Sequence, residues 1–136
     1  MAVFFDTNVL IYSISRDPAE AVKRERAITL LEREDGSLSI QVLQEFYTQA
    51  TRATRMHRLA HEMAVDLITG WTRFPVQELN LTVLNDALKI TLRYGFSYWD
   101  SAIIAAARAL GCREVFTEDM RDGQHVENIV IVNPFR

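Results

Sequence analysis

Short apolar runs alternate with longer amphipathic stretches along the chain, and this pattern predicts alternating strands and helices. Five runs of apolar, β-branched or aromatic residues are predicted strands: Ala2–Phe5, Ser37–Ile40, Arg73–Val76, Glu114–Thr117 and Ile129–Val132. The amphipathic stretches predict helices over Val9–Ile14, from Asp17-Pro18 onward, and over Gln41–Thr54, His57–Trp71, Thr82–Tyr94 and Trp99–Leu110. Strands that alternate with helices favour a parallel sheet covered on both faces, so the expected fold is a three-layer α/β/α sandwich with a central parallel sheet.

Polar residues and glycines mark the expected helix ends. Thr7 or Asn8 is the expected cap of the first helix, and Ser97-Tyr98-Trp99-Asp100 has the S-x-x-D form of a capping box. Gly95 and Gly111 follow the last apolar positions of their helices, where glycine commonly ends a helix.

The composition is that of an ordinary globular protein. The 136 residues are 49% hydrophobic and 24% charged, which argues against disorder and coiled coils and predicts one domain over residues 1–136. No apolar run is long enough for a membrane span and no signal peptide is evident, so we expect a cytoplasmic protein without membrane contact. The single cysteine excludes a disulfide framework and a cysteine-cluster zinc site.

The formal net charge of −3 argues against a strongly basic clamp for nucleic acid. An acidic enzyme can still act on nucleic acid when metal ions compensate its carboxylates. Charge alone therefore does not decide the class of substrate.

The candidate chemistry is a set of carboxylates at the ends of predicted elements. Asp6 closes the first strand, Asp119 follows the strand Glu114–Thr117, and Asp100 lies in the first turn of its helix. Glu45 interrupts the apolar positions of another helix. Ligands of parallel sheets bind at the carboxyl ends of the strands, and grouped carboxylates need a compensating cation, for which oxygen ligands favour Mg²⁺ or Mn²⁺.

Each acid also has a structural interpretation. Asp6 could cap the turn after its strand, Asp100 could be only the capping-box acid, and Glu45 could extend to solvent at the edge of an apolar face. Asp119 and Asp122 lie in an acidic turn that could simply be solvated. The shared placement of the acids, rather than any one of them, supports a site.

Three arginines recur at three-residue spacing near the junction of two predicted helices. Arg52, Arg55 and Arg58 are candidates for contact with the phosphates of a nucleic acid, and the alternative is a solvated helix face.

Four segments in order resemble the PIN domain family, and within it the VapC-type toxins of toxin–antitoxin pairs. They are Val3–Leu10 (VFFDTNVL), Gln41–Tyr47 (QVLQEFY), Tyr98–Ala107 (YWDSAIIAAA) and Phe116–Met120 (FTEDM). The resemblance spans nearly the whole chain and implies a metal-dependent endoribonuclease. The fold that it implies is the sandwich predicted above.

The resemblance also implies roles for individual residues. The four acids of the family fall on Asp6, Glu45, Asp100 and Asp119. Its polar residue after the first motif falls on Asn8 and its hydroxyl on Thr117, while Asp122 lies close enough to share or replace the role of Asp119. The implied reaction is hydrolysis of an RNA phosphodiester with Mg²⁺ or Mn²⁺, leaving a 5′-phosphate and a 3′-hydroxyl.

The implied partners are a small antitoxin, whose C-terminal segment would lie near Glu45, and a second copy of the chain in a homodimer. Two other classes remain in view. One is a non-catalytic PIN-like interaction module with a vestigial acidic site. The other is a phosphoryl-transfer or receiver domain that uses Asp6, which is disfavoured because Thr7-Asn8 follow Asp6 and no lysine follows Lys89.

Overall fold

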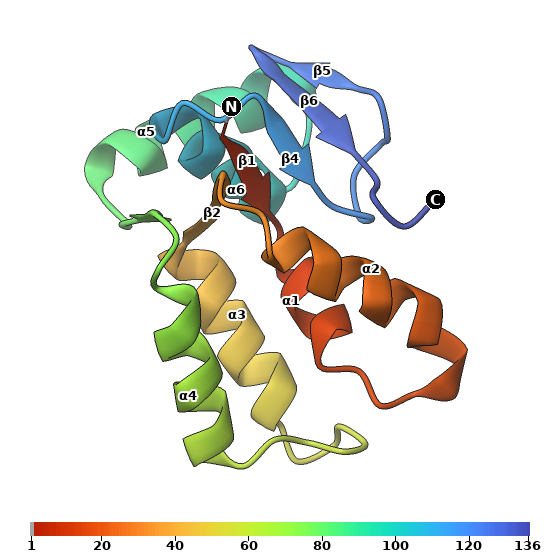
Figure 1. The fold of residues 1–136 in the computed structure, drawn as a ribbon. Coiled ribbons are helices and arrows are strands. Elements are labelled where there is room, and N and C mark those ends of the chain that lie inside the picture. Colours follow the sequence, from red (N-terminus) through yellow and green to blue (C-terminus); the bar gives the residue numbers. More distant parts are fainter. Residues whose placement is uncertain (1) are drawn as a thin grey trace.

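A six-stranded sheet runs through the middle of the molecule in the order β3-β2-β1-β4-β6-β5 (Figure 1). The computed structural model describes residues 2–136. The strands are β1 (Val3–Phe5), β2 (Gly36–Ser39), β3 (Val76–Gln77), β4 (Glu114–Phe116), β5 (His125–Val126) and β6 (Ile129–Val132). All neighbouring pairs are parallel except β5 and β6, which are antiparallel. The expected parallel sheet is therefore confirmed for five strands and extended by one antiparallel edge strand.

The central strand β1 pairs with β2 on one side and β4 on the other. Phe4 is opposite Ser37 and Val115 in the two registers. The backbone N–H of Asp6 donates to the carbonyl of Phe116 over 3.0 Å, so the carboxyl ends of β1 and β4 stay side by side. This register brings the residues that follow the two strands together.

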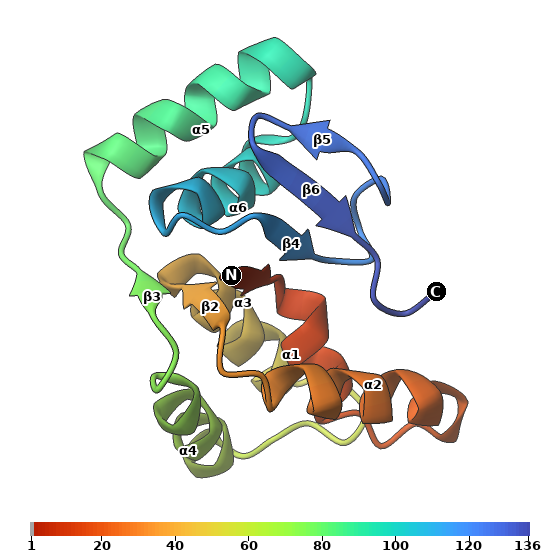
Figure 2. The same ribbon diagram turned by 45° about the horizontal axis from the view of Figure 1, so that its top comes forward.

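Helices cover both faces of the sheet. They are α1 (Thr7–Ser13), the 3₁₀ helix η1 (Pro18–Glu20), α2 (Ala21–Leu31), α3 (Ile40–Thr51), α4 (His61–Trp71), α5 (Leu81–Tyr94) and α6 (Tyr98–Ala109). In Figure 2, α5 and α6 lie to one side of the strands, while α1, α2 and α4 lie to the other. The three-layer sandwich is thus the fold that the strand–helix alternation predicted.

The core is built on apolar runs without alternation. Val3, Phe4 and Phe5 are all fully buried, as expected for a strand covered on both faces. Phe46 of α3 meets Trp71 of α4 edge to face, with ring centroids 4.7 Å apart, which joins these two helices.

Two helix ends agree closely with their sequence signals. Gly95 ends α5 in the left-handed region at φ 75°, a conformation that favours glycine. The hydroxyl of Ser97 accepts from the backbone N–H of Asp100 over 3.1 Å and so caps α6. No helix among residues 2–136 is both long enough and apolar enough to cross a membrane.

Other boundaries differ from the predictions. The first helix begins at Thr7 and is capped by Asp6, so the expected cap at Thr7 or Asn8 is wrong. The predicted helices through Thr54 and from His57 are also too long, because the backbone is extended at Arg52 and left-handed at His57 (φ 58°). No glycine or proline marks this interruption in the sequence.

The third strand lies later than predicted. It forms at Val76–Gln77 rather than Arg73–Val76, because the backbone N–H groups of Arg73 and Phe74 donate to the carbonyls of Gly70 and Trp71 (3.4 and 3.0 Å) and so continue the turn after α4. The two-residue strand β5 has no apolar run of its own and exists through its pairing with β6.

Candidate active site

A cavity of about 300 Å³ opens where the carboxyl ends of β1 and β4 meet α1, α3 and the first turn of α6. Five of its lining side chains are carboxylates, and none of the described lining residues is basic. The lining consists of Asp6, Thr7, Asn8, Ile11, Tyr12, Glu20, Gln41, Glu45, Gln49, Trp99, Asp100, Ile103 and Asp119. The structure therefore brings together the four acids that the sequence singled out.

Asp6 is the most buried of these acids, with 6% of its surface exposed. As the residue between β1 and α1, it accepts from the backbone N–H of Thr7 (2.7 Å) and from the Thr117 hydroxyl (2.8 Å). Asp6 thus caps a helix and lines the cavity at once, so its capping role is compatible with the predicted role in a site.

Burial controls the protonation of Asp6. Removal from water raises the pKa of its carboxyl from 3.8 to about 7, and the hydrogen bonds from Thr117 and Thr7 oppose this rise. The negative charges of Asp119 and Glu45 raise the pKa further. At neutral pH the Asp6 carboxyl is therefore near the midpoint of its titration, and a nearby cation would favour its ionised form.

Asn8 and Thr117 connect Asp6 to Asp119. The Asn8 side-chain amide donates to the Thr117 hydroxyl (3.0 Å) and to Asp119 Oδ2 (3.2 Å). The fully buried Thr117 hydroxyl also accepts from the backbone N–H of Asp119 over 3.0 Å. This network ties the loop after β4 to the start of α1.

Glu45 reaches the cavity from the middle of α3. The hydroxyl of Thr7 donates to Glu45 Oε1 over 2.8 Å, so the carboxylate turns toward Asp6 and not freely to solvent. Gln41 and Gln49, one helical turn before and after Glu45, line the same cavity.

Asp100 lines the cavity from the first turn of α6. Burial, followed by the charge of Asp119, raises the pKa of the Asp100 carboxyl, while the hydrogen bond with Ser97 lowers it. The neighbouring Trp99 is 64% exposed, and its carbonyl accepts from the Gln41 side-chain amide over 3.3 Å.

The remaining candidates lie outside the cavity. Asp122 accepts from the backbone N–H of Asn133 (2.7 Å) and forms an ion pair with Arg136 (3.1 Å), and both interactions lower the pKa of its carboxyl. This geometry favours Asp119 over Asp122 as the fourth acid. Arg52, Arg55 and Arg58 lie in the connection between α3 and α4, and none of them lines the cavity.

The donor set suits a hard divalent cation, although no closed ligand cage is present. Among residues 2–136, no three His, Cys, Asp or Glu side chains are grouped closely enough to hold a metal ion by themselves. The buried Oδ1 of Asn8 has no hydrogen-bond partner in the described chain and adds an unused acceptor beside the acids. Mg²⁺ commonly takes one or two carboxylates and keeps several waters, which fits oxygen donors spread around an open cavity.

Sequence reasoning missed several lining residues. The sequence pattern predicts Thr7 only as a helix cap and does not single out Tyr12, Gln41 or Gln49 as site residues. The helical spacing of Gln41, Glu45 and Gln49 is a signal that could have found two of them, because residues four apart share a helix face.

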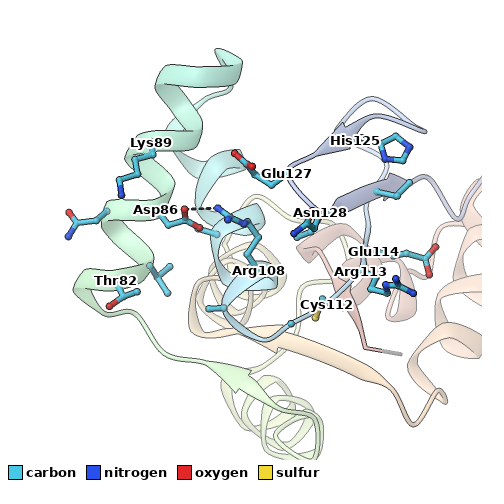
Figure 3. A pocket seen from close by; sticks show the side chains of 17 residues that line it. Thr82, Asp86, Lys89, Arg108, Cys112, Arg113, Glu114, His125, Glu127 and Asn128 are labelled. Atoms are coloured by element: carbon cyan, nitrogen blue, oxygen red, sulfur yellow. Dashed lines mark hydrogen bonds and ion pairs between the residues drawn. The ribbon is translucent and has the colours of Figure 1, made fainter.

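A larger cavity of about 1270 Å³ lies away from these acids, between α5, α6 and the starts of β4 and β6 (Figure 3). Its lining carries both charges, and Asp86 and Arg108 form an ion pair there over 2.6 Å. None of the residues that the sequence singled out as site candidates lines this cavity.

Comparison with protein families gives one assignment. The PIN domain family model matches residues 3–125, which includes all four cavity acids predicted from the sequence. Among curated proteins, none shows significant sequence similarity to the chain.

Three solved structures share the fold over most of their length. A toxin–antitoxin complex from Klebsiella pneumoniae contains a chain 17% identical, with a TM-score of 0.73 and 98% coverage of both chains. VapC20 of Mycobacterium tuberculosis, a toxin that cleaves the sarcin–ricin loop, is 21% identical, with a TM-score of 0.65 and coverage of 87% of this chain and 92% of its own. A DNA-bound VapBC from Salmonella typhimurium is 22% identical, with a TM-score of 0.63 and 96% coverage of both chains.

Proposed function

The chain belongs to the PIN domain family, and from this premise we propose that it is a metal-dependent endoribonuclease, the toxin of a toxin–antitoxin pair. The observation that carries the proposal is the cavity in which Asp6, Glu45, Asp100 and Asp119 converge, with no basic residue among its described lining residues. The RNA-cleaving activity of the structurally similar Mycobacterium tuberculosis toxin supports the same assignment.

The chain's own groups suggest a division of labour. Asp6, Asp100 and Asp119 would hold Mg²⁺ or Mn²⁺, and Glu45 would complete the site or orient the attacking water. Asn8 and Thr117 keep the carboxylates of Asp6 and Asp119 in place through their hydrogen bonds. When bound, the cation supplies positive charge for the phosphate oxygens and lowers the pKa of water.

The direct test is cleavage of a mixed pool of structured RNAs by purified, partner-free protein in Mg²⁺, Mn²⁺ or EDTA. Asp6→Asn and Asp100→Asn are expected to abolish cleavage while leaving the fold intact, because each removes a charged oxygen ligand. Circular dichroism and thermal unfolding check the fold of each variant.

Asp122→Asn is the matched control, since it removes a nearby carboxylate that lies outside the cavity. We expect it to cleave as the unchanged protein does. Cation binding without cleavage of any RNA would instead support the interaction module with a vestigial site, and full activity of a folded Asp6→Asn, Asp100→Asn double variant would refute the site.

We also propose that Arg52, Arg55 and Arg58 contact RNA phosphates outside the cavity. Arg52 and Arg58 are exposed, and all three belong to the α3–α4 connection, which carries no acid between residues 52 and 60. Phosphate contacts position a nucleic acid without reading its sequence. Replacement of the three arginines by alanine should therefore weaken the binding of all RNA substrates to a similar extent.

A small antitoxin is the proposed protein partner. The similar chains from Klebsiella pneumoniae and Salmonella typhimurium are found in toxin–antitoxin and VapBC complexes. An arginine in a partner segment placed near Glu45 would be attracted to a cavity with five acids and no described base, and would compete there with a cation.

A second copy of the chain is proposed to pack against the exposed face of α5. The leucines at 81, 84, 88 and 92 follow helical spacing and project away from the buried Val83, Ala87 and Ile90. Together with nearby apolar residues they are 38–89% exposed: Leu79, Leu81, Leu84, Leu88, Leu92 and Trp99.

A further inference from the structure

Glu118 lies between two site residues but faces away from the acidic cavity. Thr117 before it bonds to Asp6, and Asp119 after it bonds to Asn8. Glu118 is not among the residues that line the cavity. Its carboxylate instead meets Tyr12 and Lys23, so the loop after β4 is held from both sides.

The contacts of Glu118 join three separate segments. The hydroxyl of Tyr12, in α1, donates to Glu118 Oε1, and the Nζ of Lys23, in α2, donates to Glu118 Oε2 over 3.0 Å. Lys23 Nζ also donates to the Tyr12 hydroxyl over 3.2 Å and lies 4.9 Å from the centre of its ring. Each of the three residues therefore contacts both of the others.

Tyr12 is fixed from a further direction. The ring of Phe135 packs edge-on against it, with centroids 4.8 Å apart, while Tyr12 itself lines the acidic cavity. An aromatic ring held in this way gives Glu118 a rigid donor rather than a mobile surface partner.

We infer that Tyr12, Lys23 and Glu118 form a positioning clamp that sets the orientation of the Thr117–Asp119 loop and thereby aims Asp119 into the cavity. The inference rests on the proposed function for the role of Asp119. The Lys23–Glu118 pair is partly exposed, with side chains 41% and 23% accessible, so its contribution to overall stability is small. Its effect is on local geometry, where the neighbouring backbone N–H of Asp119 and the side-chain amide of Asn8 report the loop position.

The test compares Glu118→Gln and Lys23→Met with the matched control Glu127→Gln. Glu127 forms a similarly exposed ion pair with Arg93 over 3.1 Å, away from the acidic cavity. Without metal or RNA, nuclear magnetic resonance measures hydrogen exchange at the Asp119 amide and the shifts of the Asn8 side-chain amide.

We expect Glu118→Gln and Lys23→Met each to raise Asp119 amide exchange by at least about fivefold and to move the Asn8 signals, without faster exchange in the core strands. The double variant Glu118→Gln, Lys23→Met should raise Asp119 amide exchange little beyond the single variants, because both single changes release the same loop. The control should leave both signals unchanged. Unaltered Asp119 exchange and Asn8 signals in both single variants would overturn the clamp.

Calorimetric titration with Mn²⁺ connects the clamp to the site. Release of the loop is expected to weaken Mn²⁺ binding about tenfold, as for other changes that misorient a metal ligand without removing it. Failure of the unchanged protein to bind Mn²⁺ would count against the proposed function, whereas the resonance measurements would still decide the clamp. Equal Mn²⁺ affinities in the unchanged protein and in variants with a released loop would reject its role in aiming Asp119.

Discussion

Asp6 caps a helix and is almost completely buried, and these two features have opposite effects on the charge of its carboxyl. Its hydrogen bonds from Thr7 and Thr117 favour the carboxylate, but burial outweighs them and raises its pKa to about 7. Since the unfolded chain releases this proton near pH 3.8, the folded state binds the proton more tightly between these values. Stability contributed by the protonated group is therefore present below about pH 4 and is lost as the pH rises to 7.

The fall in stability with rising pH gives a prediction for Asp6→Asn, which removes the titrating group. In EDTA, the free energy of unfolding of the unchanged protein should fall by about 1–3 kcal/mol more than that of the variant between pH 5 and pH 8. Urea denaturation at the two pH values measures the difference. Parallel pH profiles for the two proteins would show that Asp6 does not titrate in this range.

A bound cation should offset the loss of stability that ionisation of Asp6 causes as the pH rises. At pH 8, added Mg²⁺ is expected to stabilise the unchanged protein, because it binds the folded state with Asp6 ionised, and to stabilise Asp6→Asn much less. The shift in unfolding temperature between Mg²⁺ and EDTA is the measurement. Equal shifts in both proteins would place any bound cation away from Asp6.

At the scale of elements, strand β2 depends on a glycine for its approach to the core. A Cβ at Gly36 would clash with the ring of Phe5 and come within 2.9 Å of Phe74 Cε1. Both rings are buried, so Gly36→Ala should lower the free energy of unfolding by about 1–3 kcal/mol.

Gly70 is the matched control for that substitution. It lies in the last turn of α4, and a Cβ there meets nothing within 4 Å. Gly70→Ala should therefore stabilise the protein by about 0.5–1 kcal/mol, through the higher helix propensity of alanine. Denaturation of both variants under one set of conditions tests the pair, and a neutral Gly36→Ala would mean that Phe5 and Phe74 can move aside.

Elements with strong local signals were predictable from the sequence, and those defined by distant contacts were not. The predicted strand at Ile129–Val132 agrees with β6. In contrast, β5 depends on its partner strand, and the end of α3 at Thr51 follows from an extended Arg52 that no glycine or proline announces.

In the candidate site, too, the features with local sequence signals were predictable and those that depend on distant contacts were not. The acids could be predicted because each follows a strand or stands out on a helix, and the cavity does bring Asp6, Glu45, Asp100 and Asp119 together. The bond from Thr7 to Glu45 could not be predicted, since it joins residues 38 positions apart through the packing of α1 on α3.

At the scale of the whole molecule, the exposed leucines of α5 predict self-association. Leu88→Glu places a charge in the middle of the apolar stripe and should convert the proposed dimer to a monomer, because a buried unpaired carboxylate is costly. Sedimentation velocity over a range of concentrations measures the change.

Val22→Glu is the control for this prediction. Val22 is an equally apolar residue, 82% exposed, on α2 rather than α5. Its substitution should leave the dimer intact. If the unchanged protein sediments as a monomer at all concentrations, the proposed interface is wrong.

The hydrogen bond from Thr117 to Asp6 joins residues that are 111 positions apart. During translation, Asp6 is made before its partners on β4 and the following loop, which come after α6 in the chain. A chain interrupted before β4 therefore lacks Asp119 as well as the bond that orients Asp6. Unfinished or clipped products should be inert, and the acidic site can form only once the β4 segment has been made.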